Sequence, residues 1–343
     1  MDKLIIASTR ENAGKTSVII GMAKTLGKSF GYLKPFGDRL FYQKKRLWDY
    51  DSALMVNIFD LEGNPEDMSM AFEHAKVRYM YDEETTKKKL SEMISDIGNS
   101  KDLVFIEGGK DLMYGASVRL DAISLARHVN GELLIVVSGD EGMIMDDLSF
   151  VKRYVDITDI NFKGVIINKV QNLDDFEDTC LDSIKKMGID VIGIIPQKPQ
   201  LTYISVNSLI EHLFVKVIAG EKGLDSVVKN IFIGAMNADD AHLDPLFKRE
   251  RKLIITSGDR SDMILTALES DTAGIILTNN IVPAPNIISK AAESNIPLLL
   301  VSEDTYQVAS KIDRMDSVLS KNETEKIDLL GKLVEEYVDT EKI

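Results

Sequence analysis

The chain has 343 residues, of which 44% are hydrophobic and 28% charged, and its formal net charge is −14. This composition is typical of a globular protein of one to three domains, and the acidic excess argues against nucleic-acid or anionic-membrane partners, which require a basic face. No apolar run approaches the ~20 residues that span a bilayer. The N-terminus lacks a signal-peptide layout, and the single cysteine excludes an internal disulfide. We therefore expect a cytoplasmic protein.

Short β-branched runs alternate with helical patterns over the first part of the chain. The predicted strands cover residues 3–8, 30–33, 103–109, 133–139, 164–170 and 191–197. Apolar residues at helical spacing predict a helix over residues 17–26. Near-continuous apolar strands separated by helices are typical of a parallel sheet that is covered on both faces. We place the end of this first α/β domain at residue 205.

A second, smaller α/β series follows and is assigned to residues 206–320. Its predicted strands and helices cover residues 230–236, 252–258, 261–270, 272–278, 286–294 and 296–302. The last segment, 321–343, is predicted to be an amphipathic helix. Its apolar stripe consists of Ile327, Leu330, Leu333, Val334 and Tyr337. Such a stripe indicates either a helix docked on its own domain or a subunit interface.

The segment "STRENAGKTS", residues 8–17, lies between the first predicted strand and the first predicted helix. A phosphate-binding loop occupies this position because backbone N–H groups at a helix N-terminus point at the phosphate. Gly14 allows close backbone approach, Lys15 supplies the cation, and Thr16 supplies a hydroxyl for magnesium. Thr9 stands where the strict loop pattern has its first glycine. A Gly-Lys-Thr that merely opens a helix is the alternative.

Polar residues follow several predicted strands at the point where each strand ends. Lys34 follows "FGYL", Glu107 ends "LVFI", Asn168 ends "GVII", and Asp51 opens "DSALMV". Ligands of open parallel sheets bind outside the carboxyl ends of the strands, so we expect these side chains and the loop to converge on one crevice. Carboxylates suit magnesium, and an amide can pair with an adenine edge.

That order of motifs resembles dethiobiotin synthetase and its relatives. The matching segments are "STRENAGKTS", "GYLKPFG", "YDSALM", "FIEGG", "GVIINKV" and "VIGIIPQ". The resemblance implies a P-loop NTPase-type sheet and the cofactors ATP and Mg²⁺. It implies nucleotide contacts from Ala13, Gly14, Lys15, Thr16, Ser17 and Asn168, the last at the adenine. It also implies magnesium at Thr16, Asp51 and Glu107, with Lys15 and Lys34 as the catalytic cations and Lys34 near the transferred phosphate.

The second half resembles the DRTGG domain, on "TSGDRSDMILTAL", "AGIILTNN", "IPLLLVSEDT" and "VASKI". The pairing of the two domains resembles the N-terminal region of long bacterial phosphotransacetylases, in a stand-alone form without the acetyltransferase domain. We expect a second-domain ligand at Asp259, Arg260 and Thr278, and an Asp259–Arg260 pair that caps the next helix is the alternative. Asn279 and Asn280 replace Gly-Gly of the DRTGG signature, and because Asn tolerates positive φ the turn can be kept.

Two further departures bear on function. "FGDRLF" replaces the small, serine-containing stretch that follows Lys-Pro in dethiobiotin synthetase, which argues against dethiobiotin synthesis itself. Arg10 stands where the wider family of dimeric relatives has a lysine that reaches into the partner's nucleotide site. We expect Arg10 to be a surface or salt-bridging residue, with a trans-acting role as the alternative. The same relatives pair across their nucleotide sites, so we expect a homodimer.

Two functions follow from the resemblance. The first is a regulatory protein that binds Mg-ATP, senses a nucleotide or metabolite, and acts on a partner such as an acyl- or phosphotransferase. The second is an ATP-dependent ligase that phosphorylates a carboxylate or carbamate, in which Lys15, Lys34 and magnesium position and neutralise charge. In neither case is the chain expected to be an acetyltransferase by itself.

Overall fold

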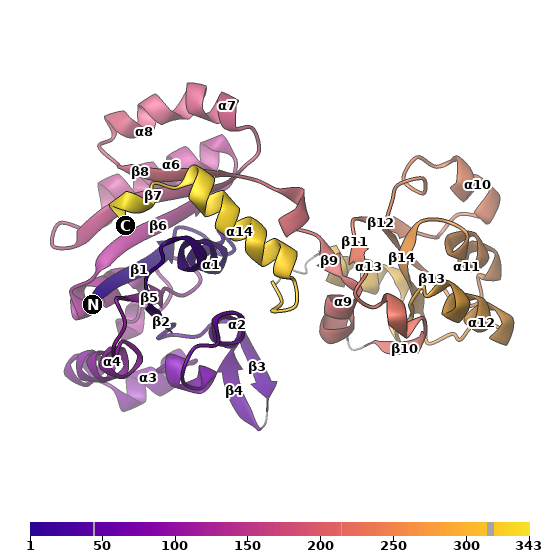
Figure 1. The fold of residues 1–343 in the computed structure, drawn as a ribbon, viewed down its shortest axis with the longest axis horizontal. Coiled ribbons are helices and arrows are strands. Elements are labelled where there is room, and N and C mark those ends of the chain that lie inside the picture. The colour runs from indigo at the N-terminus through magenta and orange to yellow at the C-terminus, as the bar shows by residue number, and fades with distance from the viewer. Residues whose placement is uncertain (44, 214, 314–318) are drawn as a thin grey trace. The chain divides into compact units, whose positions relative to one another are not determined.

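The computed structural model describes residues 1–43, 45–213, 215–313 and 319–343, which form two compact units. The first unit comprises Met1–Lys198 together with Leu319–Ile343, and the second comprises Pro199–Val318. The chain therefore passes from the first compact unit to the second after Lys198. Its end returns to the first unit, where the yellow C-terminal helix of Figure 1 lies.

The first unit is built on a six-stranded sheet in which all the paired strands are parallel. Its order is β2 (Phe30–Leu33), β5 (Leu103–Glu107), β1 (Asp2–Ser8), β6 (Glu132–Ser138), β7 (Asn161–Val170) and β8 (Val191–Pro196). The central strands are nearly continuous runs of buried residues, as expected of a sheet covered on both faces. The predicted α/β fold class is confirmed.

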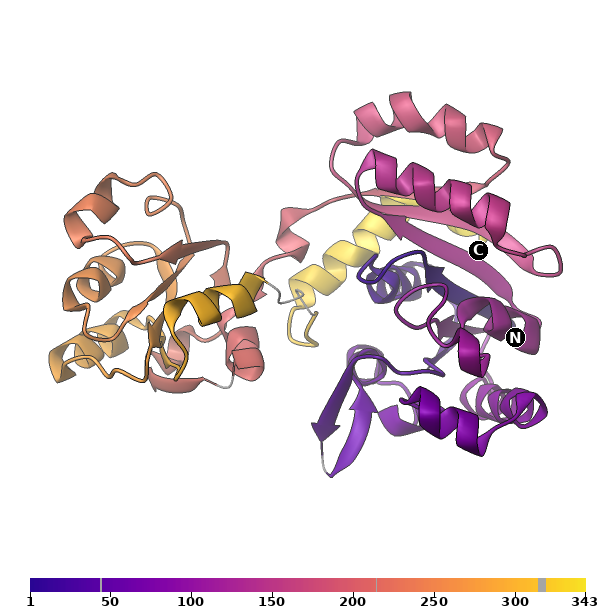
Figure 2. The same cartoon turned by 180° about the vertical axis from the view of Figure 1, so that it is seen from behind.

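Helices cover the two faces of this sheet (Figures 1 and 2). The helices of this unit are α1 (Lys15–Thr25), α2 (Tyr50–Phe59), α3 (His74–Met80), α4 (Glu83–Ile97), α5 (Ala122–Val129), α6 (Glu141–Tyr154), α7 (Leu173–Phe176), α8 (Asp182–Lys186) and α14 (Thr324–Tyr337), of which α2 and α3 lie beside the hairpin of β3 (Leu40–Gln43) and β4 (Arg46–Asp49). Ile5 and Ala7 of β1 join a core with side chains of α4, α5 and α6. The β3–β4 hairpin is antiparallel and precedes α2. Short turns of other helix types are η1 (Pro65–Met68), η2 (Ala116–Val118), η3 (Glu177–Leu181) and η6 (Thr340–Lys342).

The C-terminal helix α14 packs against α1, and Figure 1 draws the two side by side. The apolar stripe predicted from the sequence is buried at Ile327, Leu330, Leu333 and Val334. Gly21 permits the close approach, because a Cβ there would lie 2.3 Å from Cγ2 of Val334. The predicted stripe therefore serves docking onto the first unit.

The second unit has a five-stranded sheet. Its order is β10 (Lys216–Ala219), β15 (Leu298–Leu300), β14 (Thr272–Thr278), β13 (Lys252–Ser257) and β12 (Asn230–Ile233). The pairs are parallel except β10 with β15. Around it lie α9 (Val206–Leu213), α10 (Ala238–Leu243), α11 (Ser261–Leu268), α12 (Pro285–Ser294), α13 (Thr305–Asp313), β9 (Ile204–Ser205), β11 (Val227–Val228), η4 (Pro199–Leu201) and η5 (Glu221–Gly223). Two apolar cores result, one containing Ile254 and Ile275 and the other Leu253 and Ile276.

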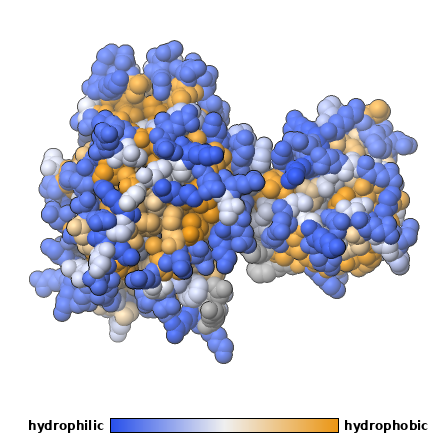
Figure 3. Space-filling model, viewed as in Figure 1, coloured by the Kyte–Doolittle hydropathy of each residue, from blue (hydrophilic) through white to orange (hydrophobic). Residues whose placement is uncertain are grey.

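On the face drawn in Figure 3, hydrophilic residues surround scattered hydrophobic patches on each unit. Within the described ranges, no helix has both the length and the hydropathy required to cross a membrane.

Candidate functional site

The loop between β1 and α1 is held in a conformation that glycine adopts most readily. Gly14 precedes the first turn of α1 with φ 96° and ψ 30°, in the left-handed region. A Cβ at this position would lie 2.4 Å from Nδ2 of Asn168. The loop therefore enters the helix closely packed against the end of β7, with the α1 N-terminus facing the carboxyl edge of the sheet.

Lys15, the first residue of α1, turns its side chain back over the loop and is buried. Its Nζ donates to Oγ of Ser8 at 2.8 Å and to the carbonyl oxygen of Lys110 at 3.1 Å. Burial lowers the pKa of Lys15, although nearby Glu107 acts in the opposite direction. Oγ1 of Thr9, in the same loop, is buried and has no hydrogen-bond partner within the described residues. A buried polar atom without a partner is a natural contact point for a ligand.

The carboxylate of Glu107 connects the α1 N-terminus to the sheet. Oγ1 of Thr16 donates to its Oε1 at 2.9 Å, and the hydroxyl of Tyr32 on β2 donates to its Oε2 at 2.8 Å. The carboxylate is buried at the end of β5, so burial raises the pKa of Glu107 to about 7 despite the attraction of Lys34. Two of the three predicted magnesium ligands, Thr16 and Glu107, are thus in direct contact.

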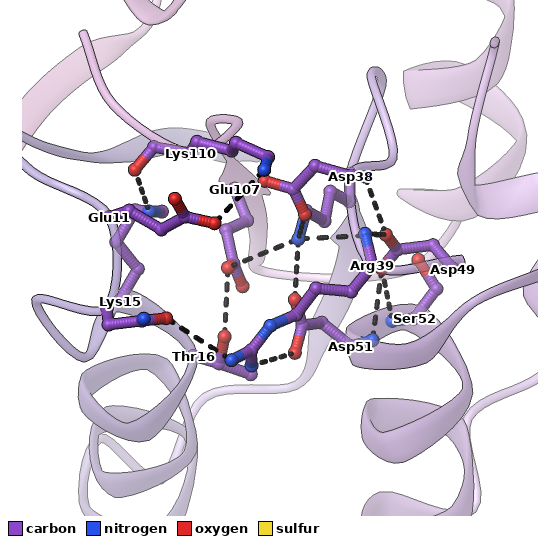
Figure 4. A network of polar contacts seen from close by, with 12 residues as sticks. Glu11, Lys15, Thr16, Asp38, Arg39, Asp49, Asp51, Ser52, Glu107 and Lys110 are labelled. Carbon is purple, nitrogen blue, oxygen red and sulfur yellow. Dashed lines mark hydrogen bonds and ion pairs between the residues drawn. The ribbon is translucent and has the colours of Figure 1, made fainter. Parts of the chain in front are cut away.

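Lys34 is the centre of the buried charges and follows the last residue of β2. Its Nζ donates to Oδ2 of Asp51 at 2.5 Å and to Oδ1 of Asp38 at 2.6 Å. Asp49 lies 3.7 Å and Glu107 3.8 Å from the same nitrogen. Figure 4 shows these four carboxylates converging from three different segments of the chain. The third predicted magnesium ligand, Asp51, is thereby brought to the same cluster.

Asp49 organises the chain around this cluster. Its Oδ1 accepts from the backbone N–H groups of Asp51 and Ser52 and caps α2. Its Oδ2 accepts from the backbone N–H groups of Asp38 and Arg39. One buried side chain thus fixes both the first turn of α2 and the loop that follows Lys34.

The cluster has more acidic than basic groups, because four carboxylates face the ammonium groups of Lys34 and Lys15 and the guanidinium of Arg39. Burial alone would lower the pKa of Lys34, but attraction by Asp51 and the other carboxylates raises it well above its usual value. Burial would raise the pKa of Asp51, but Lys34 and Arg39 hold it below its usual value. Burial raises the pKa of Asp49 to about 6. The surplus negative charge suits an added cation.

Asn168 lies under the loop at the end of β7. Its Nδ2 donates to the carbonyl oxygen of Ala13 at 2.9 Å, and its Oδ1 accepts from the backbone N–H of Lys169 at 3.0 Å. Ala13 is buried, and Ser17 lies partly exposed in the first turn of α1. Asn168 therefore supports the loop in this structure, and its predicted contact with adenine stays a prediction.

Arg10 makes the salt bridge expected of it. Its guanidinium forms two parallel hydrogen bonds to Asp147 of α6, at 2.9 Å and 2.8 Å. The pair lies on the surface, where the Arg10 side chain is 44% exposed. The alternative role across a dimer stays a prediction.

Sequence reasoning missed Asp38, Asp49 and Tyr32 as members of the cluster. Asp49 and Asp51 stand two residues apart in "WDYD", and that pair of acids was a usable signal. Asp38 lies four residues after Lys34, in the segment "FGDRLF" that departs from the resemblance. Nothing in the sequence marked Tyr32 as a site residue, because an aromatic residue inside a predicted strand usually belongs to the hydrophobic core.

The residues predicted to bind a ligand in the second unit do not form a buried cluster like that around Lys34. Asp259 is exposed, and Arg260 pairs with Asp262 at 3.2 Å and donates to the carbonyl oxygen of Met236 at 2.6 Å. Arg260 occupies the N-cap position of α11 without a side-chain capping hydrogen bond. The alternative, an Asp259–Arg260 pair that caps α11, is therefore wrong, because among the described residues no side chain caps this helix and Arg260 pairs with Asp262 in its first turn.

Thr278, the last residue of β14, is buried and its Oγ1 lies 3.3 Å from Oγ1 of Thr305. Asn279 and Asn280 follow with φ 59° and φ 54°. Both asparagines thus adopt the left-handed conformation expected of them. Their backbone N–H groups donate to the carbonyl oxygens of Glu303 and Val301. The turn is kept, with its backbone donors satisfied internally.

Comparison with known proteins identifies both units. A family model described as an AAA domain matches residues 2–205, and one described as a DRTGG domain matches residues 208–315. The chain belongs to this AAA-domain family. The predicted pairing of a dethiobiotin-synthetase-like P-loop domain with a DRTGG domain, as in phosphotransacetylases, is confirmed.

Curated relatives of this AAA-domain chain include two phosphate acetyltransferases. The protein of Nitratidesulfovibrio vulgaris is 23% identical over 366 residues, covering 100% of this chain and 51% of the relative. The protein of Synechocystis sp. is 24% identical over 358 residues, covering 99% of this chain and 51% of the relative. The chain thus spans about half the length of the curated relatives it matches.

Among solved structures, the CBS and DRTGG domains of the regulatory region of Clostridium perfringens pyrophosphatase, complexed with the activator diadenosine tetraphosphate, are similar to part of the chain. The identity is 14% and the TM-score 0.29, over 45% of this chain and 74% of that one.

Proposed function

We propose that the first unit binds Mg-ATP and that the protein is regulatory, altering the action of a partner according to nucleotide or metabolite. The observation that carries this proposal is the buried network at the carboxyl edge of the sheet, where Lys15, Thr16, Lys34, Asp51 and Glu107 meet. Its position, directly after a β-strand and at the N-terminus of α1, is the position in which helices bind phosphate.

The chemistry of the donor set supports magnesium. Thr16, Asp51 and Glu107 would hold the ion through a hydroxyl and two carboxylates, the hard oxygen ligands that magnesium prefers. The excess of carboxylates over the cationic groups of Lys15, Lys34 and Arg39 favours an added cation at this cluster. Bound magnesium would neutralise charge on the phosphates.

Nucleotide contacts are assigned to the loop and its supports. The backbone from Ala13 to Ser17 would cradle the phosphates, with Lys15 reaching the terminal groups. Oγ1 of Thr9 is a buried donor without a partner in the described part of the chain, which a phosphate oxygen would satisfy. Asn168 would pair with the adenine through the N–H that its bond to Ala13 leaves over.

Calorimetric titration of ATP in the presence of Mg²⁺ tests the proposal. Lys15→Ala is expected to weaken binding by about 100-fold or more, or ~3 kcal/mol. Lys24→Ala is the matched control, since Lys24 lies in the last turn of the same helix and pairs with Asp328 of α14. Equal ATP affinities for wild type and Lys15→Ala, or no binding by folded wild type, would contradict the proposal.

The alternative function, an ATP-dependent ligase acting on a carboxylate or carbamate, is favoured by Lys34. A buried ammonium beside the loop is suited to hold a transferred phosphoryl group. Acceptor-dependent ADP formation in a panel of carboxylates and amines would support a ligase. A panel in which no acceptor accelerates ADP formation would leave the regulatory function.

We also propose a homodimer that pairs through α6. Met143, Phe150 and Tyr154 are exposed there, at a spacing that puts them on one stripe with Asp147, the partner of Arg10. An exposed apolar stripe beside the loop suits a twofold interface. Phe150→Glu is expected to convert a dimer to a monomer in sedimentation, whereas a dimer that persists places the interface elsewhere.

For the DRTGG unit we propose a small ligand at Asp259, Arg260 and Thr278. Asp259 and Arg260 follow β13, and Thr278 is the last residue of β14, whose end pairs with that of β13 at Ser257, so the three residues share one carboxyl edge. The relatives favour an acyl- or phosphotransferase as the partner. A purified phosphate acetyltransferase that binds wild type in an ATP-dependent way, but not Lys15→Ala, would support this assignment, and ATP-independent binding would argue against it.

A further inference from the structure

We propose that Asp38 is an internal anion that occupies the place on Lys34 where an external acceptor carboxylate would bind. This inference rests on the proposed function, because it takes the loop and Lys34 as the phosphate site. It adds a residue that decides what the site accepts: nucleotide, and no carboxylate acceptor.

The first observation is the contact itself. Oδ1 of Asp38 lies 2.6 Å from Nζ of Lys34, and the Asp38 side chain is 6% exposed. A charge-assisted hydrogen bond at this distance and burial is strong. The ammonium of Lys34 is therefore already held by a carboxylate of the geometry that an acceptor acid would present.

The second observation is that the loop is fixed in this position. The backbone N–H groups of Asp38 and Arg39 donate to Oδ2 of Asp49 at 3.0 Å and 3.2 Å. Asp49 is fully buried and also caps α2. The hydrogen bonds to Asp49 thus hold the Asp38 carboxylate beside Lys34. Because the backbone is already ordered there, the contact between Asp38 and Lys34 costs little conformational entropy.

The third observation is that the four carboxylates make different structural contacts. Asp49 caps a helix, Glu107 accepts from Thr16 and Tyr32, and Asp51 stands on the first turn of α2 beside Arg39. The Asp38 carboxylate makes none of these contacts, and among the described residues it pairs with Lys34. Figure 4 shows the Asp38 side chain among the other carboxylates of this network. It is the member of the cluster whose charge the fold needs least.

A consequence follows for the choice between the two functions. A phosphate or carboxylate that approaches Lys34 must displace Asp38 and meets its negative charge. A nucleotide has the loop and magnesium to offset this repulsion, whereas a small acid has neither. The contact therefore favours nucleotide binding without acceptor chemistry.

A different role for Asp38 makes the opposite prediction. Asp38, Asp49 and Asp51 each offer an oxygen atom within 4.8 Å of the others, so Asp38 could instead be a metal ligand. Loss of a metal ligand weakens Mg-dependent ATP binding, whereas loss of a competing anion strengthens ATP binding with or without metal. The two roles are thus separable by the sign of one change.

The first test is calorimetric titration of ATP into wild type, Asp38→Ser and Asp38→Asn, each in Mg²⁺ and in EDTA. Asp67→Asn, at an exposed position of the same unit, is the matched control. We expect Asp38→Ser to bind ATP about tenfold more tightly in both buffers, and Asp38→Asn to shift in the same direction. Unchanged affinity, or weaker binding in Mg²⁺, would overturn the proposal. Asp38→Asn keeps the shape of the side chain and serves if Asp38→Ser does not fold.

The second test uses acetate and no nucleotide, so that it is independent of ATP binding. We expect 100 mM acetate, against chloride at equal ionic strength, to raise the thermal midpoint of Asp38→Ser by about 2 °C or more. Wild type and Asp67→Asn are expected to show no acetate-specific shift. An equal response of all three proteins overturns the inference. Failure of wild type to bind ATP, with Asp38→Ser still responding to acetate, would count against the proposed function alone.

Discussion

The carboxyl edges of the two sheets differ in how deeply their charged side chains are buried and in how these side chains are paired. In the first unit, Lys34 and its carboxylates are buried and contact one another across segments far apart in the sequence. In the second unit, Asp259 is exposed and Arg260 pairs with Asp262, two residues further on. Parallel strands bring polar residues to one edge in both, so topology alone does not make a charged site.

The burial of the charged side chains is the difference that bears on ligand binding. Charges removed from water are costly unless they are paired, and a surplus of one sign raises that cost. The first unit has such a surplus, whereas at the carboxyl edge of the second Arg260 pairs with nearby Asp262 and the N–H groups of Asn279 and Asn280 donate to backbone carbonyls. Under the proposed function, bound magnesium would offset this surplus.

The largest expected effect is on stability. Lys34→Met leaves four buried carboxylates without their central cation, and we expect it to lower the free energy of unfolding by about 3–5 kcal/mol. Arg260→Met in the second unit breaks a surface pair and is expected to change stability by less than about 1 kcal/mol. Urea denaturation of both variants measures the two free energies of unfolding. Equal decreases would contradict the claim that the buried charges distinguish the first unit from the second.

The second effect is a pH dependence that belongs to the first unit. Burial raises the pKa of Glu107 to about 7 and that of Asp49 to about 6, above the unfolded values near 4. A group with a raised folded pKa stabilises the fold fully below its unfolded pKa, and this contribution is lost as the pH rises through the folded pKa. We therefore expect the urea midpoint of metal-free protein to fall between about pH 5 and pH 8.

Glu107→Gln isolates this contribution. Its side chain cannot ionise, so we expect a smaller fall of the urea midpoint over the same pH range. Glu62→Gln, at an exposed position, is the control. Burial lowers the pKa of His128 and so acts in the opposite direction, equally in all three proteins. Identical pH profiles for wild type and Glu107→Gln would show that the Glu107 carboxyl does not carry the effect.

The smallest effect is conformational and belongs to the second unit. Asn279 has φ 59°, so Asn279→Ala places a residue with a Cβ and no local polar group in the left-handed region. We expect a loss of about 1 kcal/mol in thermal or urea unfolding, and near wild-type stability for Asn279→Gly. A Gly variant as unstable as the Ala variant would assign the effect to the Asn side chain instead.

Much of the first unit could be predicted from the sequence. The apolar strands identify a covered parallel sheet, and Gly14, Lys15 and Thr16 follow the first strand directly. Lys34 and Glu107 end strands, so the rule that strand ends share one edge predicts their convergence. These inferences need only local pattern and sheet topology.

Other features depend on tertiary packing and could not be predicted in this way. The stripe of α14 indicates that one face is buried, but not that the chain returns to α1 of the first unit. Asp38 follows Lys34 in a loop whose path is fixed by Asp49, on a later hairpin strand. The partner of Arg260 depends on the rotamer of a surface side chain. The first two contacts join segments that sequence periodicity does not relate, and the third is a local choice between neighbouring carboxylates.

The measurement that tests the central claim most directly is hydrogen–deuterium exchange with and without Mg-ATP, in wild type and Lys15→Ala. We expect nucleotide to slow exchange in residues 8–17, 34–51 and 107–110 of wild type, and to leave these segments unchanged in Lys15→Ala. Exchange in these segments that does not respond to Mg-ATP in wild type would contradict the account, whatever the second unit does.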